Sequence, residues 1–129
     1  MTLTRLSCLA AAAIAWLTAA CTGTPPPVAA PAPAHILVFS HTTGFRHASI
    51  EPGIVALEEI AAAKGYTVTA SEDPGVFTAE GLTPFDAIVF LSATTRRNEP
   101  DSEWLQETGR AALKDFIRSG RGVVGIHAA

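Results

Sequence analysis

Residues 35–71 read HILVFSHTTGFRHASIEPGIVALEEIAAAKGYTVTAS and contain the pattern that decides the fold. The apolar run HILVFS predicts a short buried strand, and YTVTAS predicts the next strand. Between them, apolar residues recur at helical spacing over 50–65, where Ser49 is placed to cap the helix and Gly65 to end it. A strand, a helix and a second strand in this order predict two parallel strands joined by a crossover helix.

The same alternation continues toward the end of the chain. The stretch DPGVFTAEGL carries turn signals and suits one helical turn, and FDAIVFLS then predicts a buried strand around 87–91. The run GVVGIH, residues 122–127, predicts a fourth buried strand. Before it, a long amphipathic helix ending at Gly120 is indicated by apolar residues at helical spacing, namely Trp104, Leu105, Ala112, Leu113, Phe116 and Ile117.

Strands that alternate with helices and are apolar on both faces favour an α/β fold, with a parallel sheet between two helical layers in a three-layer sandwich. The expected strand order is 2-1-3-4, as in the first four strands of a flavodoxin-like sheet. With 129 residues and a formal charge of −3, the chain has room for one small domain. No helix follows the fourth strand, so we expect the chain to be a fragment truncated inside a larger domain.

The N-terminus predicts export. One cation precedes an apolar stretch over 6–20, which is too short to span a bilayer because spanning takes about 20 residues. Small residues before Cys21 resemble a bacterial lipobox, with Thr18 in place of the usual Leu. We therefore expect a lipoprotein signal peptide over 1–21, with Cys21 lipidated and holding the protein at a membrane. The alternative is ordinary signal-peptidase cleavage near 30–34, which would release a periplasmic or extracellular protein.

The composition of the mature chain limits its structure and its partners. Residues 22–34, TGTPPPVAAPAPA, predict a semi-extended Pro/Ala-rich linker or, alternatively, a disordered leader without a role. Cys8 and Cys21 are the only cysteines, so the domain over 35–129 has no thiol for a disulfide or for nucleophilic catalysis. The nine Lys and Arg residues are dispersed rather than gathered in a stripe, which excludes nucleic acid as an expected partner.

Polar residues cluster after three of the predicted strands. Ligands of open parallel sheets bind beyond the carboxyl ends of the strands. The predicted strand order makes these three ends neighbours, so we expect their side chains to line one crevice. His127 follows the fourth strand, and the other two loops supply His41, Thr42, Thr43, Arg46, His47, Ser92, Thr94 and Thr95.

Each of these residues also has a simpler interpretation. His127 could be a buried histidine bonded to backbone, and His47 a neutral neighbour of a helix N-terminus. Arg46 on a surface loop is by default a solvated charge, whereas Ser92 and the threonines are common turn formers. Phe45 would then serve as a packing plug. The residues alone leave both interpretations open.

Three motifs, FSHTTGFRHASI, IVFLSATT and GRGVVGIHAA, together resemble the signatures of ThuA-like domains, the trehalose-utilisation family. The resemblance covers roughly residues 36–129, with the middle motif the looser match, and the C-terminal half of the family pattern is missing. It implies a fold similar to class I glutamine amidotransferases. The matching positions are His41, Gly44, Phe45, Arg46, His47, Ser49, Gly125, His127, Ala128 and Ala129.

The last motif, GIHAA over 125–129, lies where the similar amidotransferases have Gly-x-Cys-x-Gly, so imidazole replaces the thiol nucleophile. Glutamine hydrolysis through a thioester is thereby excluded. His127 is left with general acid–base chemistry or with metal ligation, and the sequence does not choose between them. A metal ion held by histidines is the one cofactor that this chemistry suggests.

The resemblance implies a small carbohydrate ligand, either a disaccharide or an oxidised sugar. The candidate catalytic residues are His127 and His47, as acid and base, and Arg46, which would orient an oxygen of the ligand. We expect His41, His47 and His127 to converge on one site. The alternative is a non-catalytic carbohydrate-binding or interaction module. Candidate substrate-binding residues are His41, Thr43, Gly44, Ser92 and Thr94.

Overall fold

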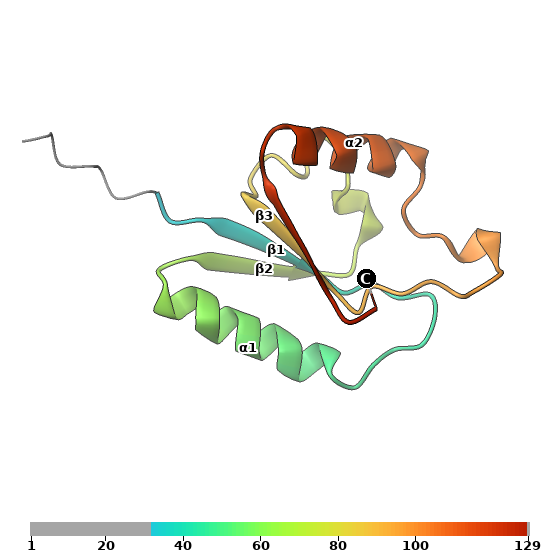
Figure 1. The fold of residues 1–129 in the computed structure, drawn as a ribbon, viewed down its shortest axis with the longest axis horizontal. Coiled ribbons are helices and arrows are strands. Elements are labelled where there is room, and N and C mark those ends of the chain that lie inside the picture. The colour runs from blue at the N-terminus through green and yellow to red at the C-terminus, as the bar shows by residue number, and fades with distance from the viewer. Residues whose placement is uncertain (1–31, 129) are drawn as a thin grey trace, which may run out of the picture. The chain divides into compact units, whose positions relative to one another are not determined.

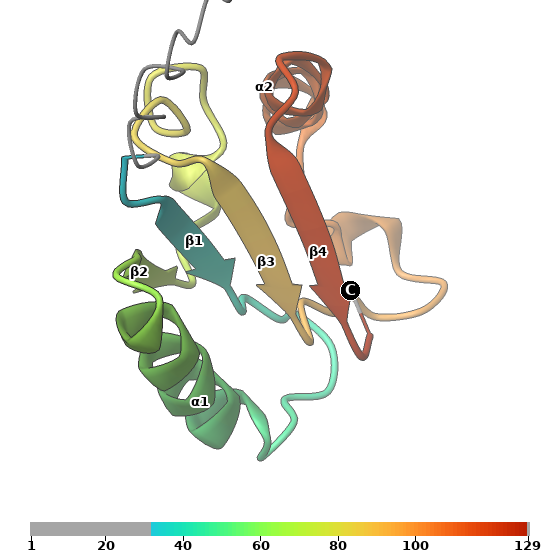
Figure 2. The ribbon, with the colours of Figure 1, turned by 60° about the vertical axis from the view of Figure 1, so that its left-hand side comes forward.

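The computed structural model describes residues 32–128, which form one parallel sheet with helices. Figure 2 shows the four strands side by side in the order β2-β1-β3-β4. All three pairings are parallel, so the predicted sheet and its 2-1-3-4 order are confirmed. The strand bounds are His35–Phe39 for β1, Thr67–Ser71 for β2, Ala87–Leu91 for β3 and Gly122–Ile126 for β4.

Two helices cover opposite faces of the sheet, which confirms the predicted three-layer α/β sandwich (Figure 1). Helix α1 spans Ile50–Ala63 and helix α2 spans Glu107–Arg118. Because successive side chains of a strand point to opposite faces, the inner strands divide their apolar residues between two cores. The core beneath α2 contains Leu37, Phe39, Phe77, Phe85, Ile88 and Phe116, and the core beneath α1 contains Val38, Val89, Leu91, Ile54 and Leu57.

The inner strands β1 and β3 carry most of the buried residues of the sheet, whereas the edge strands are more exposed. Val123 and Val124 of β4 are 39% and 50% exposed, and β2 is exposed at three of its five positions. The prediction that residues 122–127 are buried is therefore wrong for the part of the chain that the structure describes. The reason is position, because β4 pairs with β3 alone and lies at the edge of the sheet.

The connections differ from prediction mainly before α2. The predicted single helical turn is present as the 3-10 helix Pro74–Val76 (η1), and a second one, Pro100–Ser102 (η2), lies in the β3–α2 connection. Trp104 and Leu105 precede α2 instead of belonging to it. Both pack against the core beneath α2 from a non-helical segment. Their apolar spacing is therefore compatible with a helix, although α2 begins only at Glu107.

The predicted helix ends have mixed outcomes. Gly65 and Gly120 adopt φ of +73° and +89° after α1 and α2, the left-handed conformation that glycine adopts without strain. Ser49 stands at the predicted cap of α1, but its side chain makes no capping hydrogen bond. Its φ of −79° and ψ of −6° are already helical, so the hydroxyl is not directed at the first turn. The predicted N-cap position is therefore confirmed, but the helix is not capped by the Ser49 hydroxyl.

The predicted signal peptide, the lipidation site Cys21 and residues 22–31 of the predicted linker lie outside the described residues. Ala129 lies outside them as well. Within residues 32–128, the structure contains no helix of the length and apolar character that crossing a membrane requires.

Candidate functional site

Three chain segments meet at the carboxyl edge of the sheet, as the predicted strand order requires. They are the β1–α1 connection, the β3–α2 connection and the end of β4 (Figure 1). The backbone N–H of Thr43 donates to the carbonyl of Thr94 at 3.0 Å, and the N–H of Ser92 donates to the carbonyl of Ile126 at 3.1 Å. These hydrogen bonds join the first connection to the second, and the second to β4.

His47 and His127 lie against each other at this edge. Their ring centroids are 4.5 Å apart and the ring planes meet at 67°, an edge-to-face arrangement. The backbone carbonyl of His47 accepts a hydrogen bond from Ile50 N at 3.2 Å, which fixes the residue at the start of α1. His127 is exposed and His47 half-buried, so both rings can be reached from solvent. The structure thus brings together the two histidines that the sequence assigned to acid–base roles.

The residues that follow β3 and β4 both have a left-handed backbone. Ser92 has φ of 52° and His127 has φ of 60°, conformations that non-glycine residues adopt at some energetic cost. Ser92 is 1% exposed, and its Oγ has no hydrogen-bond partner among the described residues. A buried hydroxyl cannot contact a ligand at the surface, so Ser92 contributes here through its backbone bond to β4.

His41 does not join the other two histidines. Its ring lies beside Phe39 and Trp104, with centroid separations of 6.2 and 6.3 Å, in the aromatic cluster beneath α2. Among residues 32–128, no three His, Cys, Asp or Glu side chains are grouped so that they could hold a metal ion. His41, His47 and His127 therefore do not form one ligand set, and the expected convergence of all three is wrong for His41.

Arg46 is held by two carboxylates. Its guanidinium contacts Glu51 Oε1 at 2.7 Å and Glu72 Oε1 at 2.8 Å. The hydrogen bonds that Arg46 donates to Glu51 and to Glu72 raise the pKa of Arg46, and the bond from Arg46 lowers the pKa of Glu51. We call these three residues the arginine clamp. Arg46 therefore joins the loop before His47 to α1 and to the end of β2.

Sequence reasoning missed both carboxylates of this clamp. Glu72 directly follows β2 and therefore lies at the same carboxyl edge as the other polar residues, which is a signal that could have found it. Glu51 stands in the first turn of α1, where an acidic residue also interacts favourably with the helix dipole.

The threonines predicted to bind substrate also hold the two connections together. The Thr43 hydroxyl donates to the Ser102 carbonyl at 2.6 Å, and the Thr94 hydroxyl donates to the Phe45 carbonyl at 3.1 Å. Thr42 and Thr94 also share a short hydroxyl–hydroxyl hydrogen bond. These hydroxyls are engaged within the protein, so their observed role is to hold the β1–α1 connection against the β3–α2 connection.

Gly44 and Phe45 show how closely these connections approach. A Cβ on Gly44 would lie 2.8 Å from the backbone oxygen of Thr95, so only glycine fits there without displacement. Phe45 is 72% exposed, and its ring contacts that of His47 edge-to-face at a centroid distance of 4.8 Å. The interpretation of Phe45 as a packing plug is therefore wrong. It extends the surface formed by His47 and His127.

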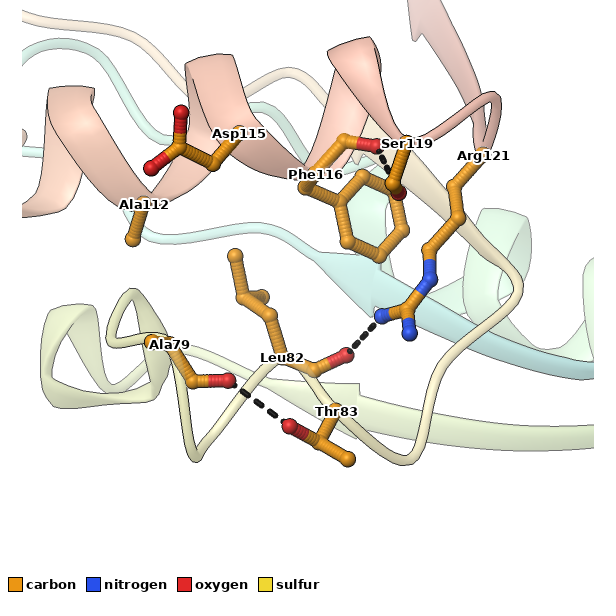
Figure 3. A pocket seen from close by; sticks show the side chains of 8 residues that line it. All are labelled: Ala79, Leu82, Thr83, Ala112, Asp115, Phe116, Ser119 and Arg121. Atoms are coloured by element: carbon orange, nitrogen blue, oxygen red, sulfur yellow. Dashed lines mark hydrogen bonds between the residues drawn. The ribbon is translucent and has the colours of Figure 1, made fainter.

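A separate cavity of about 180 Å³ lies at the opposite edge of the sheet, between the β2–β3 connection and the end of α2. Its polar groups are paired within the protein (Figure 3). Arg121 donates to the Leu82 carbonyl at 2.9 Å, and Ser119 donates to the Phe116 carbonyl at 2.6 Å. The Arg121 guanidinium also lies 5.1 Å from the centre of the Phe116 ring. This cavity lies where α2 packs against the β2–β3 connection, and few of its polar groups are free to bind a ligand.

Comparison with known proteins places the chain in a family. The model of the ThuA family, described as trehalose utilisation, matches residues 35–129. The fold is similar to the crystal structure of a ThuA-like protein from Bacteroides uniformis, with a TM-score of 0.58 and 21% sequence identity over 83% of this chain. This chain spans 41% of the length of that protein. A search of curated proteins found no match. The chain therefore belongs to the ThuA family.

Proposed function

We propose that this protein is exported and acts on a disaccharide or an oxidised sugar, with His47 and His127 as an acid–base pair. The family description, trehalose utilisation, supports a carbohydrate ligand. The contact between the two imidazoles, with ring centroids 4.5 Å apart, is the observation that carries the chemical part of the proposal. Export rests on the N-terminal sequence, through lipidation of Cys21 or through ordinary cleavage.

Acid–base chemistry on a sugar needs one group that takes a proton and one that gives it. Imidazole does both near neutral pH, and such groups typically contribute about 10²–10⁴-fold to a rate. For a disaccharide, one ring would accept a proton from the water that attacks the anomeric carbon, while the other donates a proton to the glycosidic oxygen as its bond to that carbon breaks. Because the domain over 35–129 has no cysteine, a thiol does not compete for this role.

Arg46 acts in this proposal as a positioning residue. Its guanidinium is engaged by Glu51 and Glu72, which limits its capacity to orient a ligand oxygen directly. It precedes His47 in the chain, so the arginine clamp fixes the backbone from which the His47 ring reaches His127. Its earlier assignment as a residue that orients substrate is replaced by this indirect role.

A non-catalytic carbohydrate-binding module is the second candidate. The exposed Phe45 ring beside His47 favours it, because an aromatic face can stack on a sugar without any chemistry. The two candidates differ in one outcome, since a binding module would retain sugars but leave every bond unchanged.

The test is turnover of trehalose, other disaccharides and their oxidised derivatives by the full chain, followed by proton NMR of the sugar. His47→Ala and His127→Ala should each reduce the rate by about 100-fold or more. His35→Gln is the matched control, because His35 begins β1 at the opposite edge and bonds Thr69 Oγ1 at 2.9 Å. Turnover that survives both alanine variants would refute the acid–base pair, and sugar binding without any turnover would favour the binding module.

A further inference from the structure

A cavity of about 390 Å³ lies at the carboxyl edge of the sheet, and its lining includes Ala128, the residue that follows His127. We infer that it is a subsite for a pyranose ring, which stacks on Trp104 and is hydrogen-bonded by Glu103. This inference rests on the proposed function and names the ligand that the site would take. The cavity is large enough for a sugar ring, since small-molecule sites typically begin near 300 Å³. Its lining includes Ala93, Thr94, Thr95, Glu103, Trp104, Leu105 and Ala128.

Trp104 has a fixed place in this cavity. Its indole ring packs on three phenylalanine rings, with centroid distances of 4.7 Å to Phe39, 5.4 Å to Phe77 and 6.1 Å to Phe90. The indole is only half-buried, so the part not covered by these rings lines the cavity. A rigidly backed aromatic surface binds the apolar C–H face of a pyranose at little entropic cost.

Glu103 supplies the polar side of the cavity. Its Oε1 accepts a hydrogen bond from Leu105 N at 3.2 Å, and its Oε2 lies 3.6 Å from the Arg110 guanidinium. Each carboxylate oxygen has two lone pairs, so one remains on each oxygen for a ligand donor. Neighbouring hydroxyl groups on a sugar ring are donors with a spacing that one carboxylate can accept. The cavity therefore combines an apolar platform with acceptors for hydroxyl groups.

The lining of the cavity includes residues that are next to, or bonded to, the segments that carry the histidine pair. Ala128, which lines it, directly follows His127, and Thr94, which lines it, bonds the backbone of Phe45. A sugar ring in the cavity would therefore leave its attached group or second ring near the histidine pair. A disaccharide can fill both places, one ring at Trp104 and the bond to be changed beside His127.

Two other cavities lack one half of this chemistry. A cavity of about 160 Å³ beneath α1 is lined by Leu57, Ile60 and Tyr66 with almost no polar surface. A larger cavity of about 520 Å³ has polar walls and no aromatic ring, with Thr42, Thr43, Arg96, Glu99, Asp101 and Ser102 as its lining. The cavity at Phe116 and Asp115 has both an aromatic ring and a carboxylate, but at about 180 Å³ it is smaller than the cavity of about 390 Å³ at Trp104.

The chain offers a direct reporter for this subsite. It has two tryptophans, Trp104 and Trp16, and Trp16 lies in the predicted signal peptide. Removal of that segment, or Trp16→Phe in the uncleaved chain, leaves Trp104 as the only source of tryptophan fluorescence. Titration of this variant with trehalose and with D-glucose should give a saturable change in emission. D-sorbitol, which has hydroxyl groups but no ring, is the matched control and should give none. Adding Glu103→Gln should weaken the apparent affinity on the order of tenfold, because a charged acceptor is lost.

Failure of the subsite and failure of the proposed function give different results. In Trp16→Phe combined with His127→Ala, the fluorescence response should persist while turnover is lost. Absence of a saturable response up to the solubility limit of both sugars would overturn the subsite, even if turnover depends on His127. An equal response to D-sorbitol would overturn it as well. A sugar response without any turnover would leave the subsite standing and refute the catalytic proposal.

Discussion

His127 holds its ring against His47 from a backbone conformation that side chains rarely adopt. Its φ of 60° lies in the left-handed region, which costs about 1 kcal/mol for a residue with a Cβ. Histidine is among the residues that tolerate this region best, but glycine adopts it without strain. Strain of this kind is often retained where function needs a particular side chain.

This strain predicts that glycine and alanine at position 127 differ in their effect on stability but not in their effect on turnover. His127→Gly should be more stable than His127→Ala by about 1 kcal/mol, because only glycine relieves the positive φ. Both variants remove the imidazole, so both should lose turnover equally. Thermal unfolding of the two variants measures the difference. Equal stabilities would show that the backbone at residue 127 is not strained in solution.

At the scale of elements, the arginine clamp joins the β1–α1 connection to α1 and to the end of β2. Glu72→Gln removes one of its two negative charges and should hardly change the unfolding temperature, because exposed ion pairs contribute little to stability. We expect the NMR signals of the His47 and His127 rings to shift and turnover to fall. Glu99→Gln, which breaks the exposed Arg96–Glu99 pair, is the control and should leave both unchanged. Unmoved histidine signals in Glu72→Gln would contradict the positioning role.

The contribution of the arginine clamp to stability should be lost in acid. Arg46 lowers the pKa of Glu51 in the folded protein. A carboxyl group with a lowered folded pKa contributes stability that is present above its ordinary value, about 4.3 for Glu, and is lost as pH falls through the lowered value. Because the Arg46–Glu51 pair is exposed, the difference in unfolding temperature between the wild type and Glu51→Gln should be small, present at neutral pH and absent in stronger acid. A difference that grows as pH falls would contradict this assignment.

The strands and most of the helices could be predicted because their signals are local. Continuous apolar runs located β1 and β3, and glycine marked the end of each helix. The start of α2 could not be predicted, because Trp104 and Leu105 have helical spacing but pack from an extended segment. The exposure of β4 depends on its place at the edge of the sheet, which no local pattern records.

The site was predictable only in part, because many of its contacts join residues that are distant in sequence. Strand order alone indicated that His47 and His127 would lie at the same edge. The partners of Arg46 could not be inferred, because Glu72 is distant from Arg46 in sequence and reaches it only through the pairing of β1 with β2. The hydrogen bonds by which the Thr43 and Thr94 hydroxyls join the two connections could not be inferred either, because their partners are distant in sequence.

At the scale of the whole molecule, the N-terminal prediction concerns location. Cys21 follows a signal-like segment and is expected to carry a lipid. The full chain expressed in bacteria should fractionate with membranes and incorporate labelled fatty acid, and Cys21→Ser should abolish both because no thiol is left at that position. Labelling that persists in Cys21→Ser would refute the lipobox and favour ordinary cleavage.

The central claim is that His47 and His127 form one site, and NMR of histidine-labelled protein tests it most directly. The chain has four histidines, so the ring signals can be assigned by single substitutions. We expect a nuclear Overhauser cross-peak between the rings of His47 and His127, whose centroids lie 4.5 Å apart. The His35–Phe85 contact, at 4.7 Å, reports that the sheet is folded. A spectrum that retains the His35–Phe85 cross-peak but lacks the His47–His127 cross-peak would contradict the account.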